Sequence, residues 1–104
     1  MKKVLFSVVL GVFMTGAAMA EVTDLQLATS KNCMSCHAVE RKVLGPSFKD
    51  VALRYKDDKD AAAMLASKIM KGGKGVWGPV PMPANNQVSE ADAKKLAGWI
   101  LSTK

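Results

Sequence analysis

The stretch that decides the fold is Cys33-Met34-Ser35-Cys36-His37. Two cysteines three positions apart lie on one side of a helical turn, so both thiols can reach the same porphyrin. His37, the single histidine of the sequence, follows at once and can offer a neutral imidazole nitrogen to an iron. The C-x-x-C-H pattern therefore predicts covalent attachment of one haem c through Cys33 and Cys36, with His37 as an axial ligand.

Three other interpretations of the two cysteines suit the sequence less well. A thioredoxin-like dithiol belongs in a βαβ setting, and no strand pattern flanks the motif. A structural zinc site needs four ligands, whereas Cys33, Cys36 and His37 supply three and the acidic residues are scattered. A plain disulfide would close a very small loop, would stabilise the chain little and would leave His37 without a role. Haem attachment uses all three side chains and is the favoured interpretation.

The N-terminus has the three parts of a secretory signal peptide. Met1-Lys2-Lys3 is positively charged, residues 4–14 are apolar, and Ala18-Met19-Ala20 is an A-x-A cleavage site. An uncleaved membrane anchor is disfavoured because the apolar run is shorter than the roughly 20 residues that a bilayer requires. We therefore expect a signal peptide over residues 1–20, a mature domain over residues 21–104 and a periplasmic location.

The mature domain is small enough to need help in folding. A chain of this size buries a modest fraction of its surface, and such domains are often stabilised by disulfides or a cofactor. Cys33 and Cys36 are the two cysteines of the sequence, so no disulfide remains once both hold haem. We therefore expect the haem to form a large part of the core and the haem-free chain to be poorly folded.

The charge of the sequence is moderately positive. The formal net charge is +6 at pH 7, and removal of Lys2 and Lys3 with the signal peptide lowers it to +4. Five lysines flank the segments expected around the haem, namely Lys31, Lys42, Lys49, Lys71 and Lys74. They form either an ordinary solvated surface or a positive rim that steers docking onto acidic redox partners. The excess is too small, and too poor in interleaved aromatic residues, to indicate nucleic-acid binding.

Apolar residues at helical spacing predict an all-α domain. Four helices are expected, with N-caps at Thr23, Ser47, Asp58 or Asp60, and Ser89. The third covers residues 61–71 and ends at Gly72-Gly73, as C-terminal glycines favour. The inner faces of the last two helices are expected to be Ala62, Leu65, Ala66 and Ile69, and Ala93, Leu96, Ala97 and Ile100, respectively.

The loop of residues 74–88 is the expected source of the second axial ligand. A loop this long in a small domain usually carries function, and methionine is the expected ligand because there is no second histidine. Met34 lies between the two tethers and cannot reach the opposite haem face. Met64 and Met70 fall on the third helix, where methionine usually fills the core. Met82 stands between two prolines that restrict its backbone, and it is the favoured ligand.

Further residues are candidates for supporting roles. A metal-bound histidine usually donates its other N–H to an acceptor, and the carbonyl of Pro46 is one candidate, although Gly45-Pro46 also suits a plain turn. The indole N–H of Trp77 needs a partner when buried, and a haem propionate is one possible acceptor. Asn85 and Asn86 lie close enough along the loop to hydrogen-bond the methionine sulfur or the loop backbone.

These residues together resemble a known family. The sequence is similar to the small class I cytochromes c of the bacterial cytochrome c-551 (c8) type through most of residues 21–104. The most specific matches are Cys33-Met34-Ser35-Cys36-His37, Leu44-Gly45-Pro46 and Gly75-Val76-Trp77-Gly78-Pro79-Val80-Pro81-Met82-Pro83. The resemblance implies an all-α class I cytochrome c fold of four to five helices around one covalently bound haem c, with His37 and Met82 as axial ligands.

The resemblance also implies roles for residues around the haem. Pro46 would accept the histidine hydrogen bond, Trp77 would bond a propionate, and Asn85 would bond the methionine sulfur. Lys68 stands where the family often has an arginine that reaches a propionate, and lysine lacks the bidentate fork of arginine. Ala84 replaces a proline common in the family's ligand loop, so a slightly looser loop is expected.

Two protein ligands on the iron leave no open site for a substrate. We therefore expect a soluble, monomeric, periplasmic one-electron carrier that is not an enzyme and does not insert stably into membranes. The resemblance points to acidic redox partners such as nitrite reductase, a terminal oxidase or a cytochrome complex. Two alternatives stay open: an enzyme or sensor in which Met82 is displaced from the iron, and a haem-free dithiol protein.

Overall fold

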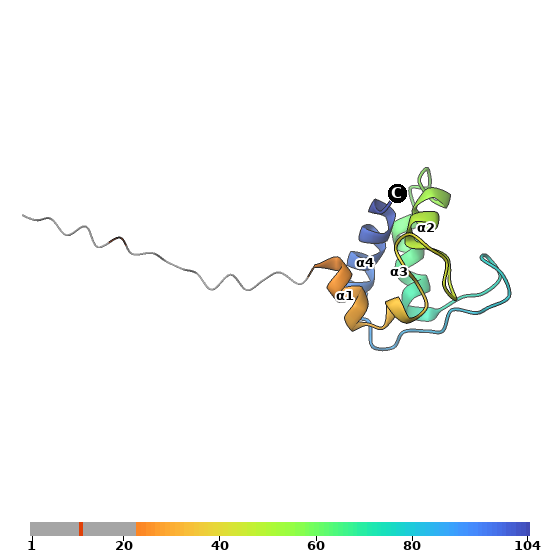
Figure 1. Ribbon diagram of the computed structural model, residues 1–104, viewed down its shortest axis with the longest axis horizontal. Coiled ribbons are helices and arrows are strands. Elements are labelled where there is room, and N and C mark those ends of the chain that lie inside the picture. The colour runs from red at the N-terminus through yellow and green to blue at the C-terminus, as the bar shows by residue number, and fades with distance from the viewer. Residues whose placement is uncertain (1–10, 12–22) are drawn as a thin grey trace, which may run out of the picture.

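The computed structural model of the protein describes Gly11 and residues 23–104, so the expected signal peptide and cleavage site lie outside the described residues apart from Gly11. Four α-helices follow in order, α1 (Asp24–Ser30), α2 (Phe48–Arg54), α3 (Ala61–Lys71) and α4 (Glu90–Ser102). A short 3₁₀ helix, η1 (Cys33–Ser35), follows α1. Across the described ranges the helices are joined by loops without a β-strand, which confirms the predicted all-α class (Figure 1).

Side-chain caps fix the starts of three helices where the sequence predicted them. The Thr23 hydroxyl accepts the backbone N–H of Gln26 at 3.2 Å, and the Gln26 side chain accepts the Thr23 N–H at 2.9 Å, which completes a capping box. The hydroxyls of Ser47 and Ser89 accept backbone N–H groups of the first turns of α2 and α4 at 3.0 and 3.1 Å. Each such bond satisfies an N–H that a helix leaves without an internal partner.

The start of α3 differs from the prediction in two respects. Asp60 occupies the N-cap position, but its side chain makes no capping bond; instead the carboxylate of Asp58 accepts the Asp60 N–H at 2.9 Å. Ala62 was expected on the inner face and is exposed, whereas Ala61 is buried. The inner side of α3 borders two different environments, since part of it packs on α4 and part lines a cavity. This division is why the buried residues depart from the predicted stripe.

Helix α4 is the centre of the domain and contacts α1, α2 and α3. Its predicted inner face is confirmed, since the four expected residues are all buried: Ala93, Leu96, Ala97 and Ile100. Alanines dominate the core, and Leu96 is the largest fully buried side chain of the described residues. Small side chains let the helices approach closely but contribute little apolar area, so the polypeptide alone builds a modest core.

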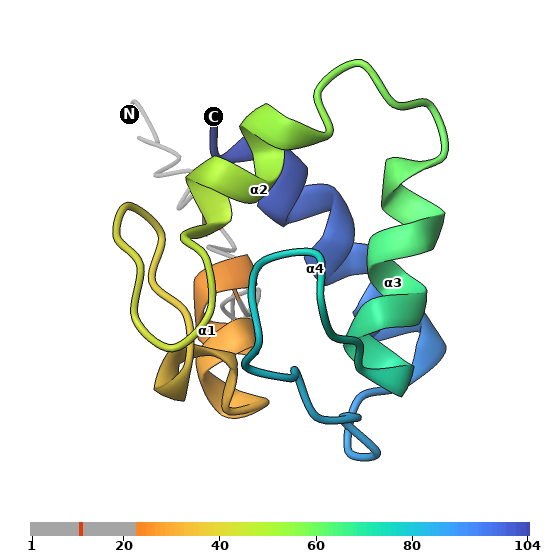
Figure 2. The same cartoon turned by 90° about the vertical axis from the view of Figure 1, so that its right-hand side faces the viewer.

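Two loops project on the side of the molecule away from α1 (Figure 1). One joins η1 to α2 over residues 38–47, and the other joins α3 to α4 over residues 74–88. Figure 2 shows the second loop arching between α1 and α3, below α2. Its first part is closed at the base by an isolated antiparallel bridge, in which Gly73 and Met82 exchange backbone hydrogen bonds of 3.0 and 2.7 Å.

Candidate haem site

The segment of residues 31–37, which carries both cysteines and is called the cysteine turn below, begins at the end of α1. Asn32 has φ of 65°, a left-handed conformation that asparagine tolerates, and it turns the chain into η1. The carbonyl of Cys33 then accepts the N–H of Cys36 at 3.2 Å and that of His37 at 3.0 Å. Both cysteines are free thiols and half-buried. Burial raises the pKa of the Cys33 thiol, with a smaller contribution from Cys36, although a backbone hydrogen bond opposes the shift.

The imidazole of His37 is oriented by Pro46. The distance from Nδ1 of His37 to the carbonyl oxygen of Pro46 is 2.8 Å, and because a carbonyl only accepts, Nδ1 carries the hydrogen. The other nitrogen, Nε2, is thereby left as a lone-pair donor, which is the form that ligates iron. The carbonyl of Pro46 was one of two options open from the sequence, and the hydrogen bond shows that the Gly45-Pro46 turn does more than reverse the chain.

Two further contacts hold the ring of His37. Gly45 lies so close that a Cβ at this position would be 2.5 Å from Cε1 and 2.9 Å from Nδ1 of His37. The Phe48 ring stacks on the imidazole with centroids 5.1 Å apart, and Phe48 in turn meets Trp99 edge to face with centroids 5.4 Å apart. The histidine is therefore fixed by a hydrogen bond, a glycine and an aromatic ring together.

A cavity of about 450 Å³ opens between the cysteine turn and the second loop. Such a volume is within the range of small-molecule and cofactor sites, about 300–1,000 Å³. Most of its lining is apolar and comes from α2, α3, α4 and the loops. Of the residues that the sequence offered for the haem site, Asn86 does not line this cavity and the other eight do: Cys33, Cys36, His37, Pro46, Lys68, Trp77, Met82 and Asn85. Thiols, an imidazole and a thioether around an apolar space fit a covalently held haem.

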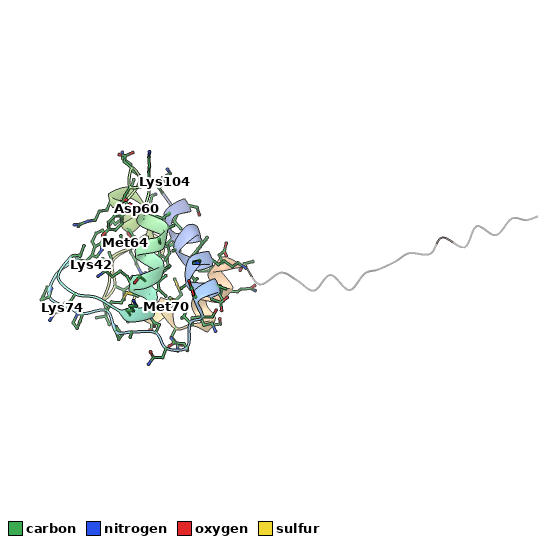
Figure 3. The ribbon with its side chains drawn as sticks, turned by 180° about the vertical axis from the view of Figure 1, so that it is seen from behind. Lys42, Asp60, Met64, Met70, Lys74 and Lys104 are labelled. Carbon is green, nitrogen blue, oxygen red and sulfur yellow. The ribbon has the colours of Figure 1, made fainter. Side chains whose placement is uncertain are left out.

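The methionines differ in whether they line the cavity. Of the four in the described residues, Met64 and Met82 line the cavity, while Met34 and Met70 do not. Met64 was predicted to fill the core, and the structure places it in the lining of the cavity. Figure 3 shows Met64 midway along α3 and Met70 near the end of the same helix. Two methionine sulfurs, those of Met64 and Met82, therefore belong to residues that border the cavity.

The backbone around Met82 is held against the end of α3. Besides the bridge to Gly73, the loop packs on Gly72, whose φ of 76° suits glycine and where a Cβ would collide with the carbonyl oxygen of Met82. The side-chain amide of Asn85 donates to the carbonyl of Ile69 at 2.8 Å and to that of Pro83 at 3.4 Å. Asn85 therefore tethers the loop to α3, and a bond from Asn85 to the methionine sulfur stays a prediction.

The tip of the second loop is anchored to α2. The guanidinium of Arg54 lies 4.8 Å from the centre of the Trp77 ring, and its Nη1 donates to the carbonyl of Val76 at 3.4 Å. Tyr55 meets Trp77 edge to face with centroids 6.5 Å apart. Trp77 lines the cavity and keeps 39% of its surface exposed, so it lies at the border of the cavity and is not a core residue.

Positive charge borders the cavity. Of the five lysines singled out in the sequence, Lys42 and Lys74 line it, and Lys68 joins them from α3. The Lys68 side chain lies across Gly73, where a Cβ would be 3.1 Å from its ammonium nitrogen. Figure 3 shows Lys42 and Lys74 along the edge formed by the two loops. Within residues 23–104, no helix is long and apolar enough to cross a membrane.

The sequence of the chain is similar to those of known proteins. A model of the cytochrome c family matches residues 25–104. The chain is a member of the cytochrome c family. It is 51% identical to cytochrome c-552 of Hydrogenobacter thermophilus over 104 residues, which cover 100% of both chains. It is also 44% identical to cytochrome c-551 of Pseudomonas aeruginosa over 94 residues, which cover 90% of this chain and 88% of that one.

A solved structure gives the same result for the fold. The crystal structure of wild-type Nitrosomonas europaea cytochrome c552 superposes with a TM-score of 0.76 at 56% identity, covering 77% of this chain and 99% of that one. The protein is therefore a class I cytochrome c of the c-551/c-552 type, an all-α electron-transport protein that carries one covalent haem c. The family, the fold and the cofactor predicted from the sequence are thereby confirmed.

Several site residues of this cytochrome could not be found from the sequence. Gly45 was expected in a turn and Phe48 had no predicted role in the site, yet both contact the ring of His37. Arg54 was not considered, although it faces Trp77. The signal was weak in each case, because a glycine before proline and an apolar residue at a helix start occur in countless turns and cores.

Proposed function

We propose that this cytochrome is a periplasmic one-electron carrier in which His37 and Met82 bind the iron from opposite faces of the haem. The observation that supports this most is that the cysteine turn and Met82, which come from distant parts of the chain, line one apolar cavity. The haem supplies a metal that changes oxidation state by one electron, and the thioether ligand raises its potential. Cys33 and Cys36 would hold the porphyrin by thioether bonds.

The residues around the cavity suit that role. The hydrogen bond from Nδ1 to Pro46 leaves Nε2 of His37 as the nitrogen that would bind the iron, and Phe48 limits rotation of the ring. The bridge to Gly73 fixes the backbone of Met82 at the border of the cavity. With both axial positions filled by protein, no site is left for a substrate, and little rearrangement accompanies electron transfer.

The propionate edge of the haem would face the second loop and α3. The indole N–H of Trp77 and the ammonium group of Lys68 are donors at the cavity and would neutralise propionate charge. Asn85 would serve the methionine sulfur only by giving up one of its two backbone acceptors, Ile69 or Pro83. We therefore assign Asn85 first to the tether of the loop.

Residues 1–20 would direct export and be removed, leaving a mature domain of residues 21–104. Docking would use the open side of the cavity, where exposed apolar residues adjoin lysines. The apolar residues lining this side are Leu44, Val76 and Val80, which keep 60%, 45% and 61% of their surface exposed. Acidic redox proteins, such as a nitrite reductase, a terminal oxidase or a cytochrome complex, would complement this surface.

The test compares two methionine variants of the purified haem protein. In the oxidised wild type, methionine bound to ferric haem gives a weak charge-transfer band in the red. We expect Met82→Ala to abolish this band, lower the reduction potential and bind CO rapidly when reduced. Met64→Ala, a matched truncation within the same cavity, is expected to keep the band and resist CO. If the two variants exchange these behaviours, Met64 is the ligand; if the wild type itself lacks the band and binds CO rapidly, the iron is open and the carrier proposal fails.

A further inference from the structure

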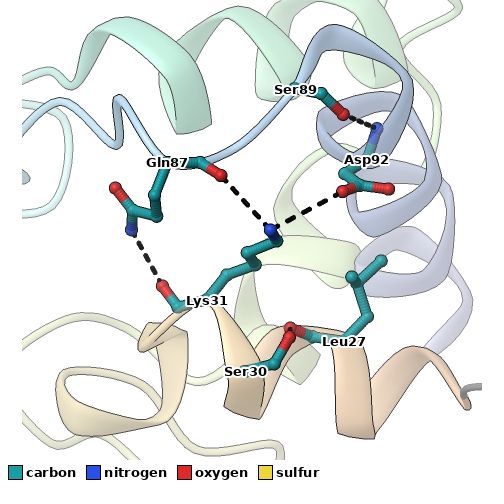
Figure 4. A network of polar contacts seen from close by, with 6 residues as sticks. All are labelled: Leu27, Ser30, Lys31, Gln87, Ser89 and Asp92. Carbon is teal, nitrogen blue, oxygen red and sulfur yellow. Dashed lines mark hydrogen bonds and ion pairs between the residues drawn. The ribbon is translucent and has the colours of Figure 1, made fainter.

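A reciprocal pair of hydrogen bonds joins the cysteine turn to the segment that follows Met82. The side-chain amide of Gln87 donates to the backbone carbonyl of Lys31 at 3.0 Å, and the Lys31 ammonium group donates to the backbone carbonyl of Gln87 at 3.3 Å (Figure 4). The same ammonium group lies 3.9 Å from the Asp92 carboxylate. Each side chain thus reaches the other's backbone, which fixes the two segments in both position and direction.

The network continues from Gln87 into the methionine loop. The Gln87 amide also donates to the side-chain oxygen of Asn85 at 3.2 Å. The Asn85 amide in turn donates to the carbonyls of Ile69 and Pro83. Two side-chain amides therefore connect three backbone segments: the end of α1 next to Cys33, the last turn of α3, and the residue that follows Met82.

This network lies where the methionine loop has few other restraints. Prolines 79, 81 and 83 have no N–H to donate, so the backbone around Met82 relies on the bridge to Gly73 and on side-chain bonds. The bridge holds Met82 itself, and the amides of Asn85 and Gln87 hold the chain on its C-terminal side. Movement of the loop away from the cavity is one route by which the sulfur can leave the iron, and that local opening breaks these contacts.

We propose that Gln87 is a positioning residue that ties the Met82 loop to the cysteine turn and thereby slows departure of the Met82 sulfur from the iron. The inference rests on the proposed His37/Met82 ligation. Gln87 is exposed and belongs to no part of the apolar core, so its loss leaves helix packing unchanged. The effect is therefore on opening of the loop and not on global unfolding.

The test measures how fast added imidazole displaces the methionine in the oxidised haem protein, followed by loss of the red charge-transfer band. Gln87→Leu keeps the size of the side chain and removes its amide. We expect displacement to accelerate about three- to tenfold, as loss of one or two neutral hydrogen bonds implies. Gln87→Glu, which keeps the shape but cannot donate to the Lys31 carbonyl, is expected to accelerate it in the same direction and serves if the leucine variant folds poorly.

Two control variants separate positioning from general stability. Asn86→Ala truncates a neighbouring exposed side chain that makes no hydrogen bond among the described residues, and it is expected to leave the rate unchanged. Thr23→Ala removes the cap at the end of α1 opposite Lys31 and lowers global stability while it leaves the bonds of Gln87 in place, again without a change in rate. A wild-type rate in both Gln87 variants, or equal acceleration by Thr23→Ala, overturns the inference. Absence of the red band in the wild type would instead reject the proposed ligation.

Discussion

The α-carbon of Gly45 rests against the imidazole of His37. A Cβ at position 45 would lie 2.5 Å from Cε1, well inside van der Waals contact, and the neighbouring carbonyl of Pro46 accepts the hydrogen of Nδ1. Position 45 therefore needs glycine for space and not for backbone freedom. A metal-binding imidazole is commonly positioned by its hydrogen-bond partner, and here the steric contact supplements that bond.

This contact predicts the result of adding one methyl group. Gly45→Ala is expected to push the imidazole off the Pro46 carbonyl and to lower the free energy of unfolding by about 1–3 kcal/mol, as overpacking does. Denaturant unfolding of the haem protein measures this change in the free energy of unfolding. Gly98→Ala is the matched control, because nothing lies within 4 Å of a Cβ there and alanine favours a helix by about 0.5–1 kcal/mol. A Gly45→Ala protein as stable as the wild type would contradict the contact.

The stacking of Arg54 on Trp77 predicts a second effect. Arg54→Lys keeps the charge but loses the planar group, so we expect the indole N–H of Trp77 to exchange with solvent several-fold faster and stability to fall by about 0.5–1 kcal/mol. NMR of the reduced, diamagnetic protein reports the exchange rate. Arg41→Lys makes the same change in the other loop, where no aromatic contact is found among the described residues, and should leave the Trp77 signal unaltered. Equal exchange rates in all three proteins would show that the stack does not hold the indole.

The lysines beside the cavity predict a rate that depends on ionic strength. Removing two of them with Lys42→Gln and Lys74→Gln should slow electron transfer to the anionic oxidant hexacyanoferrate(III) by about two- to fivefold at low ionic strength, because attraction at the open edge is lost. The difference should vanish at high salt. Lys104→Gln, at the distant C-terminus, tests whether overall charge alone is responsible (Figure 3). A Lys104 variant as slow as a single Lys42 or Lys74 variant would rule out local steering.

The cavity predicts that folding depends on the cofactor. At about 24 cal/mol per Å³, leaving 450 Å³ unfilled costs at most about 11 kcal/mol, which is comparable with the entire stability of a small domain, about 5–15 kcal/mol. A Cys33→Ala/Cys36→Ala chain without attached haem should therefore lose most of its helical circular dichroism and its cooperative thermal transition. Helix content and a melting curve equal to those of the haem-bound wild type would refute this dependence.

Local features of this fold were predictable because their causes are local. The caps at Thr23, Ser47 and Ser89 each depend on a hydroxyl placed just before an apolar periodic run. The inner face of α4 followed from spacing alone, since that helix packs against protein on its whole buried side. The face of α3 was predicted wrongly at Ala62, because a helix that borders both a neighbour and a cavity no longer shows a single stripe.

The contacts that shape the site are long-range, and no local pattern announces them. The stack of Arg54 on Trp77 and the bonds between Lys31 and Gln87 join segments far apart in sequence, and the pairing of Gly73 with Met82 closes a loop that shows no periodic pattern. The sequence predicted the thiols, the imidazole and the thioether as the haem-binding groups, because cysteine, histidine and methionine are few and the C-x-x-C-H spacing is restrictive. How each is held required the folded chain.

The bridge between Gly73 and Met82 closes residues 74–81 into a loop whose two ends lie side by side. At its tip, Gly75 and Gly78 have φ of 89° and 121°, and a Cβ at either would meet nothing within 4 Å. Natural divergence or a grafted peptide can therefore lengthen the tip or change its charge while the closing pair keeps the backbone of Met82 in place. The residues proposed for docking and the residue proposed to bind the iron can thus evolve separately within a single loop.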